Sequence, residues 1–263
     1  MHDRGDRVEV QAEHGGSMTT VSARLVVLAT GAAGRALAPD GWAVGTHRYP
    51  DRYLMADVDD PTGAFADTAV ITLDAAGVVE SFPLPGGRRR LVAWVPRSAE
   101  ADDAQLRSAV ASRTGQVRLA AQIADAEVSS FGIRRSLAAK LRTGRVFGVG
   151  DAVHEVSPIG GQGMNLGLLD AVTLAPLLVE WLSRGEPVSA LARWERHRLA
   201  SARIAARLAG VNTAVGRPRG AVGQMFAMTA LAVALSGPLS ALPTRAYAMG
   251  LDRDARLSRP PTR

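Results

Sequence analysis

An uninterrupted apolar run that leads into an acid and a glycine-rich loop constrains this chain more than any other feature. The run is Val146–Val149, and Gly150 and Asp151 come directly after it. Further glycines follow within residues 160–163, and residues 163–183 carry apolar side chains at helical spacing. We interpret this order as a buried strand, a loop and the start of a helix. The sequence therefore predicts an α/β domain with a ligand site at the end of this strand.

A second apolar run, Leu25–Ala29, has the composition of a strand that is covered on both faces, as in a parallel sheet. The alternating segment Val8–Ala12, the turn at His14–Ser17 and the segment Thr19–Arg24 predict a hairpin that leads into this run. We expect Leu25–Ala29 and Val146–Val149 to lie in one sheet.

The middle of the chain has a different character. From Trp42 to about Ser130, short strand-like segments are separated by glycine-containing turns, which predicts a mostly antiparallel sheet. Because α/β segments stand before and after it, we interpret this part as a second domain inserted into the first. The expected strands are 52–58, 69–73, 78–83 and 90–95, and the expected helices are 102–113, 117–124, 163–183, 191–210 and 221–235, before a polar tail at 252–263.

Composition excludes several classes of protein. The 263 residues are 47% hydrophobic and 21% charged, which is ordinary for a globular chain. Without cysteine, the chain has no disulfide, thiolate zinc site or catalytic thiol, and a cytoplasmic location suits it. The net charge is +6, but the arginines are scattered and aromatic residues make up only 5%, so we expect no nucleic-acid partner. We expect no signal peptide, and the most apolar stretch, 221–235, is too short for a transmembrane segment.

The residue types around the glycine loop favour a particular ligand chemistry. Asp151 is placed to accept hydrogen bonds from a sugar or polyol hydroxyl, and glycine lets the backbone approach a flat ligand closely because it has no Cβ. The next helix directs its unpaired N–H groups at the same place, which suits a group that becomes negatively charged. A connector without any ligand is the alternative interpretation. For His154 we expect a packing or capping role rather than acid–base catalysis, so no catalytic residue and no metal ligand is assigned.

The segment resembles the second flavin-binding motif of the p-hydroxybenzoate-hydroxylase-like FAD-dependent monooxygenases. The matching residues are Gly150, Asp151, Ala152, His154, Pro158, Gly161, Gln162, Gly163, Asn165, Gly167, Asp170 and Ala171. The resemblance implies that Asp151 binds the ribityl or pyrophosphate part of FAD and that residues 161–165 lie beside the pyrimidine edge of the flavin ring. It implies a cofactor-binding set of Gly150, Asp151, Pro158, Gly161, Gln162, Gly163, Met164 and Asn165.

The resemblance also implies a fold, in which an incomplete FAD-binding, Rossmann-like α/β domain comprises residues 1–44 and 131–185. An antiparallel β-rich substrate domain of residues 45–130 is inserted in it, and a helical C-terminal segment of residues 186–263 follows. We call the first domain incomplete because the sequence contains no Gly-x-Gly-x-x-Gly unit, which holds the ADP part of the cofactor. We therefore interpret the chain as the C-terminal portion of such an enzyme, with a truncated gene, a misassigned start or a separate upstream chain.

A further departure concerns the segment after Leu25–Ala29. The family has an Asp-Gly pair there and a Ser a few residues later, whereas this chain has Thr30, Gly31 and Gly34. That motif serves flavin and nicotinamide handling in the family. Its weakening argues against NAD(P)H, the reductant of intact members, as the reductant here.

The resemblance implies hydroxylation of an aromatic or polyketide-like small molecule through a flavin hydroperoxide. Two alternatives remain open: a flavin-dependent reductase of prenyl double bonds, and a catalytically dead remnant or binding protein without flavin. We also expect the strand at 25–29 to leave an open sheet edge, which an upstream chain or a second copy would cover. Without that cover, the chain should be poorly soluble or dimeric and should bind FAD weakly.

Overall fold

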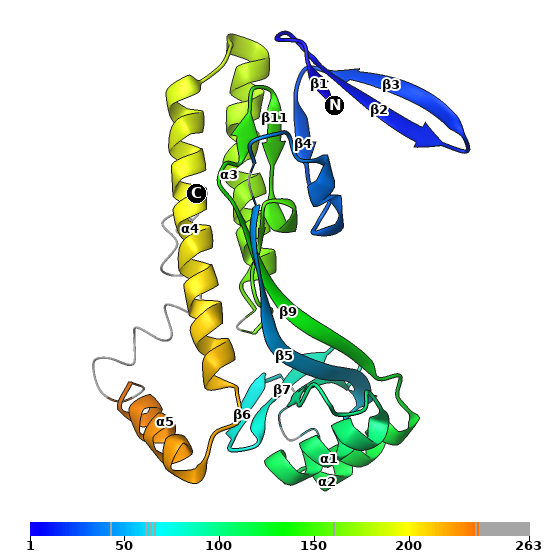
Figure 1. The fold of residues 1–263 in the computed structure, drawn as a ribbon, viewed down its shortest axis with the longest axis vertical. Helices are drawn as coiled ribbons and strands as arrows, with labels where there is room; N and C mark the ends of the chain where they lie inside the picture. Colours follow the sequence, from blue (N-terminus) through cyan, green and yellow to red (C-terminus); the bar gives the residue numbers. More distant parts are fainter. Residues whose placement is uncertain are drawn as a thin grey trace, which may run out of the picture. The chain divides into compact units, whose positions relative to one another are not determined.

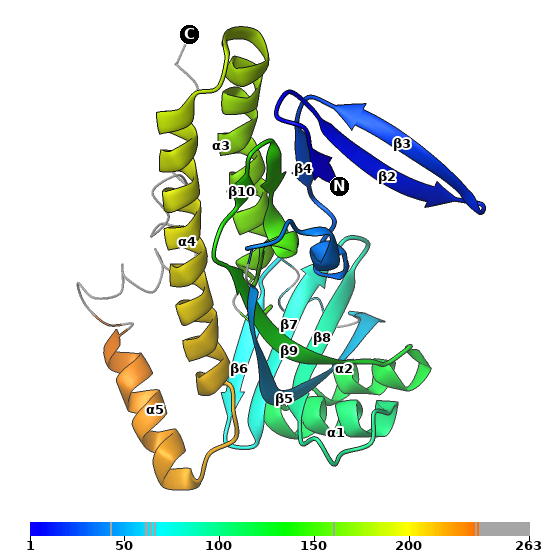
Figure 2. The same ribbon diagram turned by 45° about the horizontal axis from the view of Figure 1, so that its top comes forward.

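The computed structural model describes residues 1–42, 44–60, 63, 65, 67–159, 161–234 and 236. Its backbone contacts divide the chain into two units, which we describe separately (Figures 1 and 2). The first unit contains residues 1–47 and 134–210, and the second contains residues 48–133 and 211–240 as far as they are described. The polar tail at 252–263 lies outside the described residues.

The first unit begins with a small antiparallel sheet of order β1-β2-β3. Its strands are β1 (His2–Asp3), β2 (Val8–His14) and β3 (Ser17–Ala23). Gly15 and Gly16 form a two-residue turn with φ angles of 57° and 77°, in the left-handed region that glycine adopts without strain. The predicted hairpin is therefore confirmed, and Figure 2 shows it projecting away from the helices of this unit.

A second sheet of the first unit has the order β10-β11-β4 and contains both apolar runs. The strands are β10 (Arg142–Thr143), β11 (Val146–Gly148) and β4 (Val26–Leu28). β4 and β11 are parallel, with Val26 opposite Val146, which confirms that the two runs share a sheet. The expectation that β4 is covered on both faces is wrong, because Val27 is 42% exposed while Leu28 is buried. Successive side chains of a strand point to opposite faces, so the described chain covers only one face of β4.

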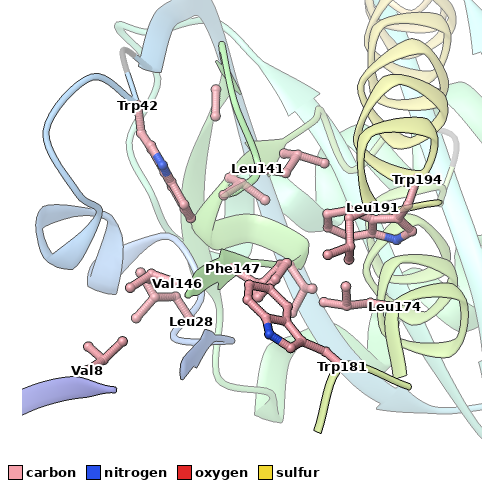
Figure 3. Close-up of a cluster of buried hydrophobic side chains, with 13 residues drawn as sticks. Val8, Leu28, Trp42, Leu141, Val146, Phe147, Leu174, Trp181, Leu191 and Trp194 are labelled. Carbon is pink, nitrogen blue, oxygen red and sulfur yellow. The ribbon is translucent and has the colours of Figure 1, made fainter. Parts of the chain in front are cut away.

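Two long helices complete the first unit. α3 (Gly163–Arg184) and α4 (Val188–Val215) lie side by side in both ribbon views, and the end of α4 belongs to the second unit. Phe147 of β11 makes edge-on ring contacts with Trp181 of α3 and Trp194 of α4, with centroid distances of 5.9 and 6.3 Å (Figure 3). The sequence predicted the second of these helices only for residues 191–210. Shorter elements of this unit are η1 (Ala33–Leu37), η3 (Gly150–Ala152) and β12 (His154–Glu155).

Among the described helices, only α3 is long and apolar enough to cross a membrane by length and composition. Core helices of soluble proteins meet the same criterion, and Leu166, Leu174 and Trp181 of α3 are buried in the protein. This finding is therefore weak evidence for a membrane span.

The second unit contains an antiparallel sheet in which β5 (Val44–Asp59), β8 (Arg88–Val95), β7 (Gly77–Leu84) and β6 (Val70–Asp74) are neighbours in that order. The sequence predicted these four strands and their antiparallel character. β9 (Ser129–Ala138) begins in this unit and ends in the first, and α5 (Ala221–Ala234) belongs to the second unit.

Two helices pack on one face of this sheet. α1 (Asp103–Thr114) begins after Asp102, whose carboxylate accepts a hydrogen bond from the Gln105 amide at 2.8 Å, and α2 (Val117–Ala121) leads into η2 (Gln122–Asp125). The side chains of the shared core include Leu54, Ala56, Val79, Leu91, Leu106 and Ile123. The whole chain is thus a mixed α/β protein.

Candidate functional site

A cavity of about 660 Å³ opens in the first unit at the carboxyl ends of the parallel strands β4 and β11. The end of a parallel sheet is the usual place for a ligand in an α/β fold. The residues that line it are Ala29, Gly31, Val149, Gly150, Asp151, Val156, Pro158, Gly161, Gly163, Met164, Gly167, Leu168 and Ala171.

The backbone turns sharply where β11 meets the cavity. Gly150 has a φ angle of 62°, and its N–H donates to Asp170 Oδ2 at 2.9 Å. Gly167, on α3, lies against this turn: a Cβ added to Gly167 would stand 3.1 Å from the Gly150 Cα. Glycine at both positions therefore lets the helix and the loop approach more closely than residues with side chains would allow.

Asp151 occupies the tip of this turn and is exposed toward the cavity. Partial desolvation by the surrounding loop and the neighbouring Glu155 carboxylate raise its pKa, whereas Arg35 and Arg134 oppose that shift. Arg35 Nη2 donates to the Asp151 carbonyl oxygen at 2.7 Å and to Glu155 Oε2 at 2.9 Å, and Arg134 Nε donates to Glu155 as well. The loop is thus held from η1 and β9 while the Asp151 carboxyl group faces the cavity.

The N-terminus of α3 forms another wall of the cavity. Gly161 has a φ angle of 65° with no atom within 4 Å of the place a Cβ would occupy, so its backbone is openly accessible. The side chain of Gln162 makes no capping hydrogen bond to the first turn, and that turn contains no acidic residue. The positive end of the helix dipole therefore lies at the cavity with no acidic residue in its own first turn.

Behind the loop lies a buried group of three ionisable side chains. Asp170 contacts His154 Nε2 through Oδ2 at 2.5 Å and accepts from Arg198 Nε through Oδ1 at 2.7 Å. Burial opposes ionisation of Asp170, but the contacts with His154 and Arg198 outweigh it and lower its pKa. His154 is buried and does not line the cavity, so it occupies the packing position that the sequence predicted.

The segment that departs from the family's Asp-Gly motif follows Ala29, which lines the cavity. A Cβ added to Gly34 would overlap the Thr30 side chain, which already fills that space. The Thr30 side chain therefore requires glycine at position 34, because any other residue there would place its Cβ in the same space. Gly31, the retained member of the motif, lines the cavity.

Most of the residues predicted for the site gather at this cavity. Gly150, Asp151, Pro158, Gly161, Gly163 and Met164 line it, whereas Gln162 is buried and Asn165 is exposed outside the lining. The predicted cofactor-binding set did not include Gly167 and Ala171. Successive steps of four residues, from 163 to 167 to 171, place these positions on one face of the helix. For Ala29 and Gly31, the sequence contains a weaker indication of a place in the site, namely their position at the end of an apolar run.

The cavity fits the flavin that the resemblance implies. Its backbone is bare at Gly161, its walls are mostly glycine and apolar side chains, and an acid stands at the strand end. A flat ring with a hydroxyl-bearing chain meets these groups well, since glycine admits the ring and the acid accepts from the hydroxyls. The uncapped first turn of α3 suits the negative charge of a reduced flavin.

Comparisons with known proteins agree with this geometry. The FAD binding domain family matches residues 1–209. The chain is 30% identical over 177 residues to 6-methylpretetramide 4-monooxygenase of Streptomyces rimosus, an alignment that covers 65% of this chain and 31% of the relative. It is 33% identical over 172 residues to a ubiquinone hydroxylase of Rhodospirillum rubrum, covering 61% of this chain and 38% of the relative. The chain thus spans about a third of the length of these curated relatives.

A solved structure shares the fold over nearly the whole chain. The p-nitrophenol 4-monooxygenase of Pseudomonas putida superposes with a TM-score of 0.78 at 19% sequence identity, covering 98% of this chain and 66% of that protein. The family match extends over well more than half of the chain and includes every residue of the cavity lining. The chain therefore belongs to the FAD binding domain family, in agreement with its resemblance to the p-hydroxybenzoate-hydroxylase-like FAD-dependent monooxygenases.

Proposed function

We propose that this chain binds FAD in the cavity of its first unit and is part of a monooxygenase that hydroxylates an aromatic or polyketide-like small molecule. The observation that carries the proposal is the meeting of Asp151, the bare glycine loop and the uncapped end of α3 around one cavity. Two of the relatives are named as a 6-methylpretetramide 4-monooxygenase and a ubiquinone hydroxylase, which supports the reaction class.

Each wall of the cavity has a part in this proposal. Asp151 accepts hydrogen bonds from the ribityl or pyrophosphate portion, and the backbone at Gly161 and Gly163 lies along the ring. The first turn of α3 stabilises negative charge on the ring electrostatically, while Val156 and Leu168 exclude water. When bound, FAD supplies the redox chemistry that activates oxygen. The assigned set includes Gln162, Met164 and Asn165 as well, with the backbone of 162–165 as the contacting part.

The domain assignment is part of the same proposal. We assign residues 1–44 and 131–185 to flavin binding, 45–130 to the substrate and 186–263 to a C-terminal helical segment, of which residues 235 and 237–263 lie outside the described residues. The antiparallel sheet of the second unit supports the middle assignment, since it is a separate layer with its own core. The residues of this sheet do not identify which small molecule is the substrate.

The proposal also includes an association that covers the exposed edge of β4 and the exposed face of α3 in the first unit. β4 is the last strand of its sheet, and α3 exposes an apolar stripe of Met164, Leu168, Val172 and Val179. Open strand edges and continuous apolar faces favour association. We propose that an upstream chain or a second copy of this chain covers the edge. We also propose that the protein is cytoplasmic. Without the cover, we expect residues 1–263 to bind FAD weakly.

Flavin binding by the purified chain tests the central proposal. We expect the protein mixed with FAD to quench flavin fluorescence saturably, and Asp151→Ala to abolish the quenching. Asp40→Ala, which removes an exposed carboxyl group from the same unit, should leave it unchanged. A chain that stays colourless and leaves FAD fluorescence unchanged would favour the binding protein without flavin. Equal quenching by Asp151→Ala would contradict the role of Asp151.

The reaction class needs a second measurement. With FAD, a reductant and a candidate aromatic substrate, a monooxygenase consumes oxygen and releases hydrogen peroxide when coupling fails. A flavin-dependent reductase of prenyl double bonds consumes no oxygen in its product-forming step. Oxygen-electrode traces with and without a peroxide scavenger therefore separate these two proposals.

A further inference from the structure

One oxygen of Asp170 holds both ends of the loop that carries Asp151. Oδ2 accepts from the Gly150 N–H at 2.9 Å, at the start of the loop, and contacts His154 Nε2 at 2.5 Å, at its end. Within the loop, the Val153 N–H donates back to the Gly150 carbonyl at 3.0 Å. The conformation that presents Asp151 to the cavity is therefore closed on itself and tied to α3 at a single atom.

The other oxygen of Asp170 is held from α4. Arg198 Nε donates to Oδ1 at 2.7 Å, and Arg198 Nη2 donates to the Leu166 carbonyl of α3 at 3.2 Å. Asp170 and Arg198 are both completely buried. A buried carboxylate stays ionised only when partners compensate the lost hydration, and arginine is the partner whose charge is permanent. The groups that face Asp170 are thus the Gly150 amide from η3, His154 from β12 and Arg198 from α4.

We propose that Asp170 is a clamp for the flavin loop and that Arg198, on a different helix, is a positioning residue of the flavin site. Arg198 keeps Asp170 ionised, ionised Asp170 holds Gly150 and His154, and the closed loop places Asp151. This inference rests on the proposed flavin function for its consequence, although the clamp itself involves only this chain. It extends the site to a residue 47 positions from Asp151, counted along the chain.

The clamp can be tested without any flavin. We expect the amide protection of residues 150–154 against hydrogen exchange to fall about tenfold or more in Arg198→Met, because Asp170 then becomes protonated. Raising the pH should restore the protection as Asp170 ionises again, an effect that simple loss of packing would not produce. Arg198→Lys keeps the charge and should retain more protection than Arg198→Met at every pH.

A matched control removes a different hydrogen bond between the same helices. Trp194 Nε1 of α4 donates to Thr173 Oγ1 of α3 at 3.0 Å, one turn from Asp170. Thr173 Oγ1 also donates to the Asp170 carbonyl at 3.3 Å, but none of the described contacts of the Asp170 carboxylate involves it. Thr173→Val should therefore leave the protection of residues 150–154 within about threefold of the original chain. Where Arg198→Met fails to fold by circular dichroism, the comparison of Arg198→Lys with Thr173→Val provides the same test.

FAD titration then connects the clamp to the cofactor. We expect Arg198→Met to weaken FAD binding about tenfold or more, with recovery at higher pH, and Thr173→Val to have little effect. Unchanged protection in a folded Arg198→Met protein, or a loss that no pH restores, would overturn the clamp. Lost protection with unchanged FAD affinity would overturn the positioning role. Failure of the original chain to bind FAD, with the exchange results as expected, would overturn only the proposed flavin function.

Discussion

Asp170 in the first unit and Glu80 in the second are both buried carboxyl groups, yet their pKa values move in opposite directions. Asp170 has charged and hydrogen-bonded partners on three sides, and its pKa is lowered. Glu80, on β7, is 3% exposed, and its Oε1 has no hydrogen-bond partner within the described part of the chain. Burial raises its pKa to about 7. The number of compensating partners, rather than depth, decides which buried acid stays charged.

Each unit also has a helix with an exposed apolar face, and in the second unit α5 exposes Val222, Met225 and Phe226. The second unit packs α1 and α2 on its sheet, and their apolar side chains share one core. In the first unit, Leu166 and Leu174 of α3 are buried, while Leu168 and Val172 of the same helix are exposed. The ion pair of Asp170 and Arg198 thus lies in a unit in which one apolar face of α3 is exposed within the described part of the chain. The following predictions separate these contributions, beginning with the largest expected effect.

Asp170→Ala should have the largest effect on stability. It leaves Arg198 buried without its carboxylate and also removes the acceptor for the Gly150 amide. Breaking a buried ion pair in this way costs about 3–5 kcal/mol of unfolding free energy. Urea denaturation at neutral pH measures it, with Asp103→Ala, at a partly exposed position on α1, expected to stay within about 0.5 kcal/mol. A change below about 1 kcal/mol for Asp170→Ala would show that the pair contributes little.

Glu80 predicts a pH dependence of the opposite sign. Because its pKa in the folded protein is about 7, above the usual 4.5, its contribution to stability is complete at low pH and is lost as the pH rises through 7. Between pH 5 and 8 this group should lower the unfolding free energy by about 2–3 kcal/mol. Asp170, with a lowered pKa, contributes stability above its unfolded pKa and loses it only in acid.

Glu80→Gln should remove the part of the pH dependence that belongs to this group. The variant is expected to match the original chain near pH 5 and to exceed its stability at pH 8, in denaturant titrations at each pH. Glu100→Gln, at an exposed position, serves as the control and should follow the original curve. Parallel curves for Glu80→Gln and the original chain would refute the assignment.

The close packing of Thr30 against Gly34 predicts a smaller effect, which a second substitution should reverse. Gly34→Ser introduces a Cβ where the Thr30 side chain lies, and overpacking of this kind costs about 1–3 kcal/mol. Thr30→Gly should restore most of that loss in the double variant, since it removes the Oγ1, Cβ and Cγ2 atoms of Thr30 that the added Cβ would meet. Thermal melts of the single and double variants form the cycle. Additive losses would mean that the two side chains do not compete for the same space.

The exposed stripe of α3 predicts the smallest change in stability. Leu168 is 55% exposed, so Leu168→Gln should alter the unfolding free energy by no more than about 0.5 kcal/mol. Leu166→Ala, at a completely buried position two residues away, should cost about 2–5 kcal/mol. In sedimentation velocity, Leu168→Gln should reduce self-association of the chain. An unchanged distribution of species would argue against this stripe as a contact surface.

Much of the fold follows from local patterns in the sequence. The hairpin at Gly15–Gly16, the four strands of the second unit and the three long helices all carry their own turn residues or periodicity, and the structure contains them. The sequence also predicted that the two apolar runs share a sheet, whereas their direct parallel pairing as β4 and β11 came from the structure. The composition of residues 25–29 favoured a strand covered on both faces, whereas Val27 is 42% exposed, because composition does not reveal what lies over a side chain.

The candidate site divides in the same way. The sequence by itself determined the glycines, the acid and the helix start, because a sharp turn and a close approach require particular residues at fixed spacing. Only the tertiary structure decided the pairing of Thr30 with Gly34, the isolation of Glu80 and the contact of Asp170 with Arg198. Those properties depend on which atoms of distant segments meet and on whether water is excluded around them. Charge and packing energies are set by that environment, which no local pattern encodes.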